Sequence, residues 1–193
     1  MESFINYLQS HNLSAHSIDS LVSSANPEAF KKGEFVLRQG EVCRHKVFVE
    51  KGLLRTFGLT TDGNEHILQF SPENTWTLDV ESYDRQIPAL YNISAIEKTD
   101  VLIWERNDFE RLRSELPELQ SLSQQLISRN IYNSRHRLLT ALGETPEQKY
   151  ENFVHTSGDL LSRLPLRMIA SFLGISLKTL TRIRKAQLHR QSK

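Results

Sequence analysis

Hydrophobic positions along the chain change their spacing twice, and each spacing predicts a different kind of element. Residues 2–25 carry apolar side chains at helical intervals, which predicts one or two short amphipathic helices that end at Asn26-Pro27. From Phe30 to about Trp104 the pattern becomes short runs rich in Val, Ile, Phe and Leu, separated by glycine-containing turns. Such runs predict a β-barrel or sandwich. Within them, Asp62-Gly63-Asn64 is predicted to be a hairpin turn, because glycine tolerates the positive φ that tight turns require.

Helical spacing returns after Arg106. Residues 107–142 are predicted to be helical, with a break or kink at Pro117. A short stripe with the 4-3-4-3 spacing of a coiled coil lies in this segment: Ile127, Ile131, Ser134, Leu138 and Ala141. The stripe is compatible with packing on the β domain, but it favours a dimer helix. Gly143 is predicted to end this helix, and Thr145 to cap the next one.

Charge is distributed unevenly between the two ends of the chain. Residues 160–193 contain eight Lys or Arg and no Asp or Glu, a net charge of +8. Residues 1–159 contain 16 Lys or Arg and 23 Asp or Glu, a net charge of −7. This asymmetry indicates a part that faces nucleic acid, joined to a part with another role.

The basic segment also has the pattern of a helix-turn-helix, from Leu166 to Lys185. Ala170 falls where the two helices cross and only a small side chain fits, and Gly174 falls where the turn needs a positive φ. Ser176 stands where the second helix needs a cap. Five apolar positions are predicted to hold the helices together: Ile169, Leu173, Ile175, Leu180 and Ile183. An ordinary helical hairpin is the alternative, although a solvated hairpin usually mixes charge signs.

In a helix-turn-helix the N-terminal part of the second helix enters the major groove of DNA. The predicted DNA contacts are Ser176, Leu177, Lys178, Thr179, Arg182, Arg184 and Lys185. Arg182 is predicted to read guanine O6 and N7, and Lys178 to read guanine or neutralise a phosphate. Ser176 and Thr179 suit phosphate contacts. The basic side chains further along provide sequence-independent attraction: Arg184, Lys185, Arg190 and Lys193.

The order of these parts resembles the Crp–Fnr (cyclic-AMP receptor protein/FNR) family of bacterial transcription regulators. The resemblance rests on four segments: 32–41, 47–52, 62–70 and 169–183. It implies an α+β fold with a cyclic-nucleotide-binding-like β-roll (a jelly-roll) at 1–106, a long dimerisation helix at 107–143 and a helix-turn-helix domain at 144–193. It also implies a homodimer on double-stranded DNA with a pseudo-palindromic operator, RNA polymerase as a further partner, and an effector that acts allosterically through the roll.

Two departures from the family pattern change the expected ligand chemistry. Asp79 stands where the family's phosphate-binding cassette has a carboxylate, but Leu78 replaces its small residue, and Ala89-Leu90 replace its Arg-Ser pair. A buried cyclic phosphate without a guanidinium would be an uncompensated charge, so cyclic AMP is not the expected effector. The effector stays unidentified, and the candidate pocket residues are Trp76, Asp79, Tyr83 and Arg85, with simple packing as the alternative. The family's C-terminal wing is also not expected in the eight residues after Lys185.

Other function classes find little support. The single cysteine, Cys43, allows no intrachain disulfide or cysteine cluster, and the histidines lack metal-ligand spacing, so no metal site is expected. No His-x-His of a cupin, Walker loop or dinucleotide fingerprint occurs, which argues against an enzyme. Without a membrane span or signal peptide, the expected location is the cytoplasm. Two alternatives remain: a cyclic-nucleotide-responsive regulator with an atypical cassette, and a protein- or RNA-interaction module with a basic tail.

Overall fold

The structure, a computed structural model, describes residues 1–191, with side chains as far as Gln187. The predicted contributions of Arg190 and Lys193 therefore fall on side chains outside the described ones. The chain forms two compact units. The N-terminal unit comprises Met1–Leu59 and Leu68–Ile127, and the C-terminal unit comprises Thr60–Ile67 and Ser128–Lys193.

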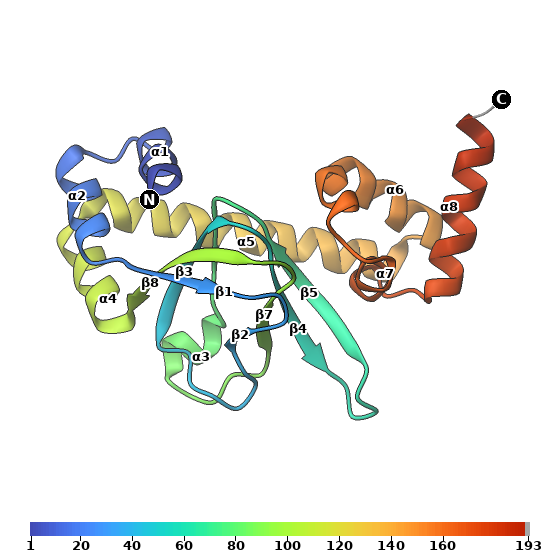
Figure 1. Cartoon of the computed structure of the whole chain (residues 1–193), viewed down its shortest axis with the longest axis horizontal. Helices are drawn as coiled ribbons and strands as arrows, with labels where there is room; N and C mark the ends of the chain where they lie inside the picture. The colour runs from blue at the N-terminus through green and yellow to red at the C-terminus, as the bar shows by residue number, and fades with distance from the viewer. Residues whose placement is uncertain (192–193) are drawn as a thin grey trace. The chain divides into compact units, whose positions relative to one another are not determined.

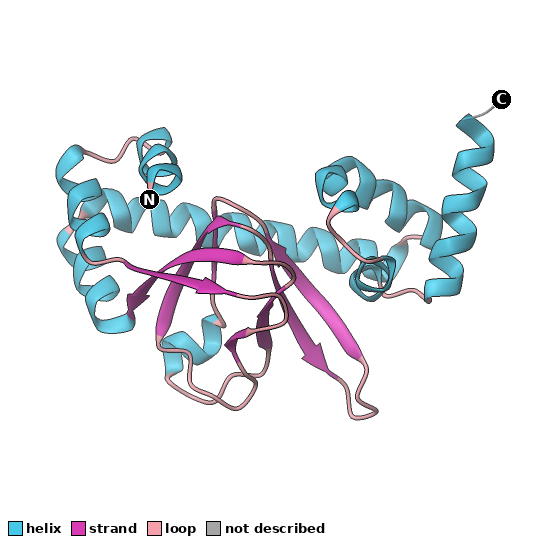
Figure 2. Ribbon diagram, viewed as in Figure 1, coloured by secondary structure: helices cyan, strands magenta, loops and turns pink. Residues whose placement is uncertain are grey.

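The N-terminal unit contains most of the strands, and they form two four-stranded sheets with the orders β1-β8-β3-β6 and β2-β7-β4-β5 (Figures 1 and 2). The strands are β1 (Asn26–Phe30), β2 (Phe35–Leu37), β3 (His45–Lys51), β4 (Leu54–Leu59), β5 (Glu65–Ser71), β6 (Thr75–Thr77), β7 (Asn92–Ala95) and β8 (Thr99–Glu105). The helices that precede and interrupt them are α1 (Glu2–Ser10), α2 (Ala15–Ser23) and α3 (Val80–Arg85). The predicted α+β class with a β-roll is confirmed.

Side chains on β3 and β8 alternate between two cores, because successive residues of a strand point to opposite faces of a sheet. Val47 and Val49 of β3 belong to a core shared with the second sheet, which includes Leu54 of β4 and Ile93 of β7. Phe48, between them, belongs to a core shared with the N-terminal helices and α4. The first sheet is therefore the middle layer of the unit, with helices on one face and the second sheet on the other.

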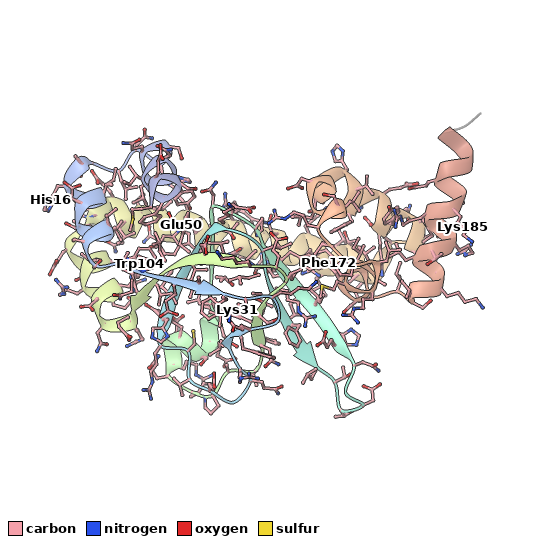
Figure 3. The ribbon with its side chains drawn as sticks, viewed as in Figure 1. His16, Lys31, Glu50, Trp104, Phe172 and Lys185 are labelled. Atoms are coloured by element: carbon pink, nitrogen blue, oxygen red, sulfur yellow. The ribbon has the colours of Figure 1, made fainter. Side chains whose placement is uncertain are left out.

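Trp104 is the largest side chain in the helix-facing core, and none of its surface is exposed. Its ring centroid lies 5.1 Å from that of Phe4 and 5.1 Å from that of Trp76. Its indole Nε1–H donates a 3.0 Å hydrogen bond to the carbonyl oxygen of Leu21, at the end of α2 (Figure 3). Trp104 thus joins β8 to both N-terminal helices by packing and by a polar bond.

The N-terminal helices end before Asn26-Pro27, as predicted, but the strands begin four residues earlier than the expected start at Phe30. Both residues belong to β1, which pairs antiparallel with β8 in the register Pro27 to Leu102. β1 lies at the edge of its sheet. Proline is tolerated in an edge strand because its missing N–H breaks no ladder on the outer side.

Pro117 divides the helical segment after the roll, as predicted. Helix α4 (Arg106–Glu115) ends before Leu116, whose extended backbone is what a residue preceding proline favours. Helix α5 (Pro117–Gly143) then begins at the proline itself. The boundary between the compact units falls inside α5, at Ile127, whereas the predicted parts divide at 106/107 and 143/144. The difference arises because α4 packs into the N-terminal core through Phe109 and Leu112.

The C-terminal unit continues with α6 (Pro146–Ser157), η1 (Gly158–Ser162), α7 (Leu166–Leu173) and α8 (Leu177–Gln191). Thr145 caps α6 as predicted, in a capping box completed by Gln148. Gly158 keeps a right-handed helical backbone with φ −61° and ψ −29°, so the chain passes from α6 directly into the 3-10 helix η1.

Candidate nucleic-acid interface

The turn between α7 and α8 has the geometry that the sequence predicts for a helix-turn-helix. Gly174 follows the last residue of α7 with φ 65° and ψ 34°, a left-handed conformation that glycine adopts without strain. The N–H of Ile175 donates a 3.0 Å hydrogen bond back to the carbonyl of Ala170, which closes the end of α7. Ala170 is only 3% exposed, so the helix crossing admits a small side chain, as expected.

The start of α8 is fixed by Ser176. Its hydroxyl accepts a 3.0 Å hydrogen bond from the backbone N–H of Thr179, which confirms the predicted cap. The hydroxyl groups of Ser176 and Thr179 lie 2.8 Å apart. Both side chains therefore stabilise the first turn of α8, and a phosphate contact by either one would have to share these hydroxyls.

Buried apolar side chains hold α8 against α6 and α7. Ile169 of α7 and Leu180 of α8 are fully buried, and Ile183 is 3% exposed. Tyr150 and Phe153 of α6 are buried in the same unit. This packing uses one face of α8 and leaves the predicted DNA-contacting side chains in solvent. The exposed ones are Ser176, Leu177, Lys178, Arg182, Arg184 and Lys185. Figure 3 labels Lys185 on α8.

Arg182, the predicted base-reading residue, is engaged by an acid that the sequence analysis missed. Its Nη2 lies 3.0 Å from Oε1 of Glu147 on α6, and both side chains are largely exposed, at 70% and 47%. Ion pairs of this kind contribute about 0–1 kcal/mol. The pair spans 35 residues, so no helical or strand periodicity in the sequence reveals it. A contact of Arg182 with a base or phosphate would therefore require it to exchange Glu147 for the DNA.

This exchange gives a measurable expectation. Replacing Glu147 with Gln should strengthen duplex-DNA binding about two- to fivefold, because it removes a competing partner worth up to ~1 kcal/mol. Fluorescence anisotropy in about 0.1 M salt measures the change, since exposed charges are only partly screened there. Glu151→Gln, on an exposed position of the same helix, is the matched control. If both variants gain equally, the gain comes from net charge and Glu147 does not restrain Arg182.

The predicted dimer stripe lies along α5 in an exposed apolar surface. Ile127, Ile131 and Leu138 are 51%, 46% and 59% exposed, and Ser134 and Ala141 are also exposed. Three further large apolar side chains on α5 are exposed: Tyr132, Leu139 and Leu142. Successive residues of a helix lie about 100° apart around its axis, so these three side chains widen the apolar face on one side of the predicted stripe. A large apolar surface on an exposed helix is more often a site of protein interaction than a surface that stays in contact with water.

Trp76 and Tyr83, two of the candidate effector residues, take part in different cores. Trp76 packs against the aromatic core around Trp104, whereas Tyr83 belongs to the core between the sheets. The Tyr83 hydroxyl donates a 3.1 Å hydrogen bond to Oε1 of Glu110. Burial, with the nearby Glu110 carboxylate, raises the pKa of Tyr83 well above its ordinary value, so the phenol stays protonated.

Asp79 and Arg85, the other two candidates, flank the ends of α3. Oδ1 of Asp79 accepts a 3.0 Å hydrogen bond from the N–H of Ser82, which makes it the N-cap of α3. The Arg85 side chain is 67% exposed and pairs with Glu81 one turn earlier. The four candidates thus have separate structural contacts, and the effector pocket stays a prediction that these contacts do not support.

The charges of the side chains inside the roll indicate whether a cyclic phosphate could bind there. Ala89, where the family pattern has an arginine, is 3% exposed and packs in the core between the sheets. Among the described residues, the only charged side chain in the buried class is Asp79, an anion. Arg55 alternates with the buried Leu54 on β4, so it faces the other side of its sheet, where Nε donates to Ser94 Oγ at 3.2 Å. These residues do not fit a buried cyclic phosphate.

Within the described residues, no group of three or more His, Cys, Asp or Glu is placed to hold a metal ion. None of the helices described is both long and apolar enough to cross a membrane.

Comparison with known proteins defines the class to which this architecture belongs. The sequence profile of the cyclic nucleotide-binding domain matches residues 27–115, from β1 to the end of α4. The transcriptional activator protein anr of Pseudomonas aeruginosa is 28% identical over 182 residues, which cover 86% of this chain and 71% of that protein. FixK2 of Bradyrhizobium japonicum has the same fold with a TM-score of 0.76 at 19% identity, covering 87% of this chain and 86% of that one. The c-di-GMP-responsive regulator CLP of Xanthomonas campestris also reaches 0.76, at 11% identity, covering 92% and 93%.

Of these relatives, anr is named as a transcriptional activator, and CLP as a global regulator that links cell-cell signalling to virulence gene expression. The matching sequence profile and the curated relatives support membership of the Crp–Fnr family, as the sequence motifs indicate. The expectation that it is not an enzyme agrees with relatives that are named as transcriptional activators. The cyclic nucleotide-binding fold is present, although its interior differs from what the ligand would need.

Proposed function

We propose that the protein is a dimeric, sequence-specific DNA-binding transcription regulator whose DNA binding does not depend on cyclic AMP. The observation that carries the proposal is the exposed basic face of α8, held by a helix-turn-helix with a left-handed Gly174 and a buried Ala170. No Asp or Glu occurs in residues 160–193 to offset that charge. A basic helix of this kind attracts the phosphate backbone and presents its N-terminal side chains to the major groove.

In this proposal the roll at 1–106 serves as the effector part, 107–143 as the dimer helix and 144–193 as the DNA-binding part. Two copies joined along the exposed apolar face of α5 would carry two recognition helices, which match a pseudo-palindromic operator. RNA polymerase is the further partner in the proposal. An effector other than cyclic AMP would act by changing the relative stability of two arrangements of the dimer.

A fluorescence-anisotropy titration tests the function. The probe is labelled duplex DNA from upstream of the protein's own gene, with and without cyclic AMP, against a scrambled duplex of the same length. We expect tight binding to the upstream duplex that cyclic AMP leaves unchanged, because the described residues of the roll include no fully buried cation for its phosphate. Binding that appears only with cyclic AMP would contradict the proposal. Equal, salt-dependent binding to duplex RNA would favour an RNA-interaction module instead.

The base-reading role of Arg182 gives a separate expectation. Replacing Arg182 with Ala should cost about 1–3 kcal/mol of DNA-binding free energy and relax the preference at one base pair. Replacing the exposed Arg184 with Ala should instead weaken all sequences alike and reduce the salt dependence. Anisotropy with a panel of single-base operator variants separates the two behaviours. A uniform loss in the Arg182 variant would show that Arg182 contacts only the backbone.

A further inference from the structure

A pocket inside the C-terminal unit lies outside the predicted DNA-contacting residues and shares one residue, Ala141, with the predicted dimer stripe. It has a volume of about 370 Å³ and is lined by residues of α5, α6 and α7. Phe153, Phe172 and Leu173 provide apolar walls. This size and lining are typical of a small-molecule site, which is a mostly apolar concavity with a few polar groups.

The charge of the lining has one sign. The titratable groups among the described lining residues are His136, Arg137 and Lys149, and none of the lining residues is Asp or Glu. Glu144, next to the pocket, holds the amide of Asn152 through both carboxylate oxygens, at 2.8 and 2.7 Å. This acid is thus bound to an amide, and the lining of the pocket itself presents cations.

Arg137 sits between the charged and the apolar parts of the pocket. Its guanidinium carbon lies 4.0 Å from the centroid of the Phe172 ring, and Nη2 donates a 3.4 Å hydrogen bond to the Phe172 carbonyl (Figure 3). The Phe172 ring lies 5.6 Å from that of Phe153, tilted by 59°. Burial lowers the pKa of Arg137, which shows that its charge is poorly solvated. An anion beside a partly desolvated guanidinium gains more than it would in water.

Lys149 adds a second donor to the same pocket. Its ammonium donates a 2.9 Å hydrogen bond to the carbonyl of Ala141, near the end of α5. A lysine ammonium has three donors, and this bond uses one of them. The side chain is therefore held in place by α5, while its charge adds to that of Arg137.

We propose that this pocket binds a small aromatic carboxylate. The carboxylate would lie at Arg137 and Lys149, and the ring against Phe153 and Phe172. The site goes beyond the proposed function, because it lies in the C-terminal unit and not in the roll. It is compatible with dimers, since Arg137 and Thr140 lie about 80° and 140° from the centre of the dimer stripe, although Ala141 belongs to both surfaces.

Isothermal titration calorimetry of the full chain with 2-naphthoate tests the proposal. We expect saturable binding that weakens at least tenfold for the neutral 2-naphthamide, which keeps the rings and loses the charge. Arg137→Gln should also weaken 2-naphthoate at least tenfold. Arg135→Gln, an exposed position of the same helix that does not line the pocket, should leave it unchanged. The absence of saturable binding, or equal binding of acid and amide, overturns the proposal.

A second pair of variants decides the matter if Arg137→Gln fails to fold, as judged by circular dichroism. Thr156 is an exposed residue of α6 that lines the pocket, and its neighbour His155 is exposed without lining it. Thr156→Trp should fill the pocket and abolish 2-naphthoate binding, whereas His155→Trp should not. Undiminished binding to Thr156→Trp would show that the acid binds elsewhere and would overturn the proposal.

Discussion

Replacing Ile131 and Leu138 together with glutamate should convert the protein to monomers and weaken binding to a two-half-site operator by about 10²–10⁴-fold. Both side chains are exposed on α5, at 46% and 59%, where a second copy would cover them. Two carboxylates in that interface would be buried without partners, which opposes association. The DNA effect follows because linked binding modules raise each other's effective concentration, and separate monomers lose this gain.

Size-exclusion chromatography with light scattering measures the mass of the double variant, and anisotropy measures its affinity for a full operator and for a half-site. Arg129→Glu is the control, because it places a glutamate on an exposed position of the same helix about 160° from the centre of the stripe. Half-site affinity should be the same in all three proteins. A double variant that stays dimeric would place the dimer interface on another surface.

Truncating Trp104 to alanine should have the largest effect on stability, about 3–5 kcal/mol in the N-terminal unit. The side chain is fully buried among aromatic rings, so its removal leaves a large cavity. It also leaves the carbonyl of Leu21 without the indole donor, which costs about 1–3 kcal/mol if that carbonyl stays buried. Trp104→Phe keeps most of the ring volume and loses only the donor, so its cost should be much smaller.

Native-state hydrogen exchange of the backbone amides in β3 and β8 measures these changes within one unit. Amides of α7 and α8 belong to the other compact unit and provide the internal reference. Equal exchange in Trp104→Ala and Trp104→Phe would mean that the hydrogen bond, and not the packing, carries the contribution.

The helix-turn-helix could be predicted because its rules are local. A small residue, a glycine and a cap stand at fixed offsets within one segment, and the structure confirms all three at Ala170, Gly174 and Ser176. The break at Pro117 is local for the same reason, since proline restricts the residue before it. Local chemistry also places the hairpin turn at Gly63, whose φ is 81°.

What the sequence could not predict depends on distant neighbours. Asn26-Pro27 becomes a strand only because β8, more than 70 residues later, supplies the pairing edge. Glu147 reaches Arg182 across a helix packing that no periodicity encodes. Asp79 matches the family's carboxylate in sequence, but its role as the cap of α3 depends on a helix that the sequence analysis did not predict.

The aromatic core of the N-terminal unit also determines which part of this protein intrinsic tryptophan fluorescence can monitor. The chain has two tryptophans, Trp76 and Trp104, and they share that core. Intrinsic tryptophan emission therefore follows the melting of the roll and is insensitive to the C-terminal unit, whose aromatic residues are tyrosine and phenylalanine. A thermal shift seen in that emission would locate a ligand or a mutation in the first unit. A change confined to the DNA-binding helices would need a reporter placed there.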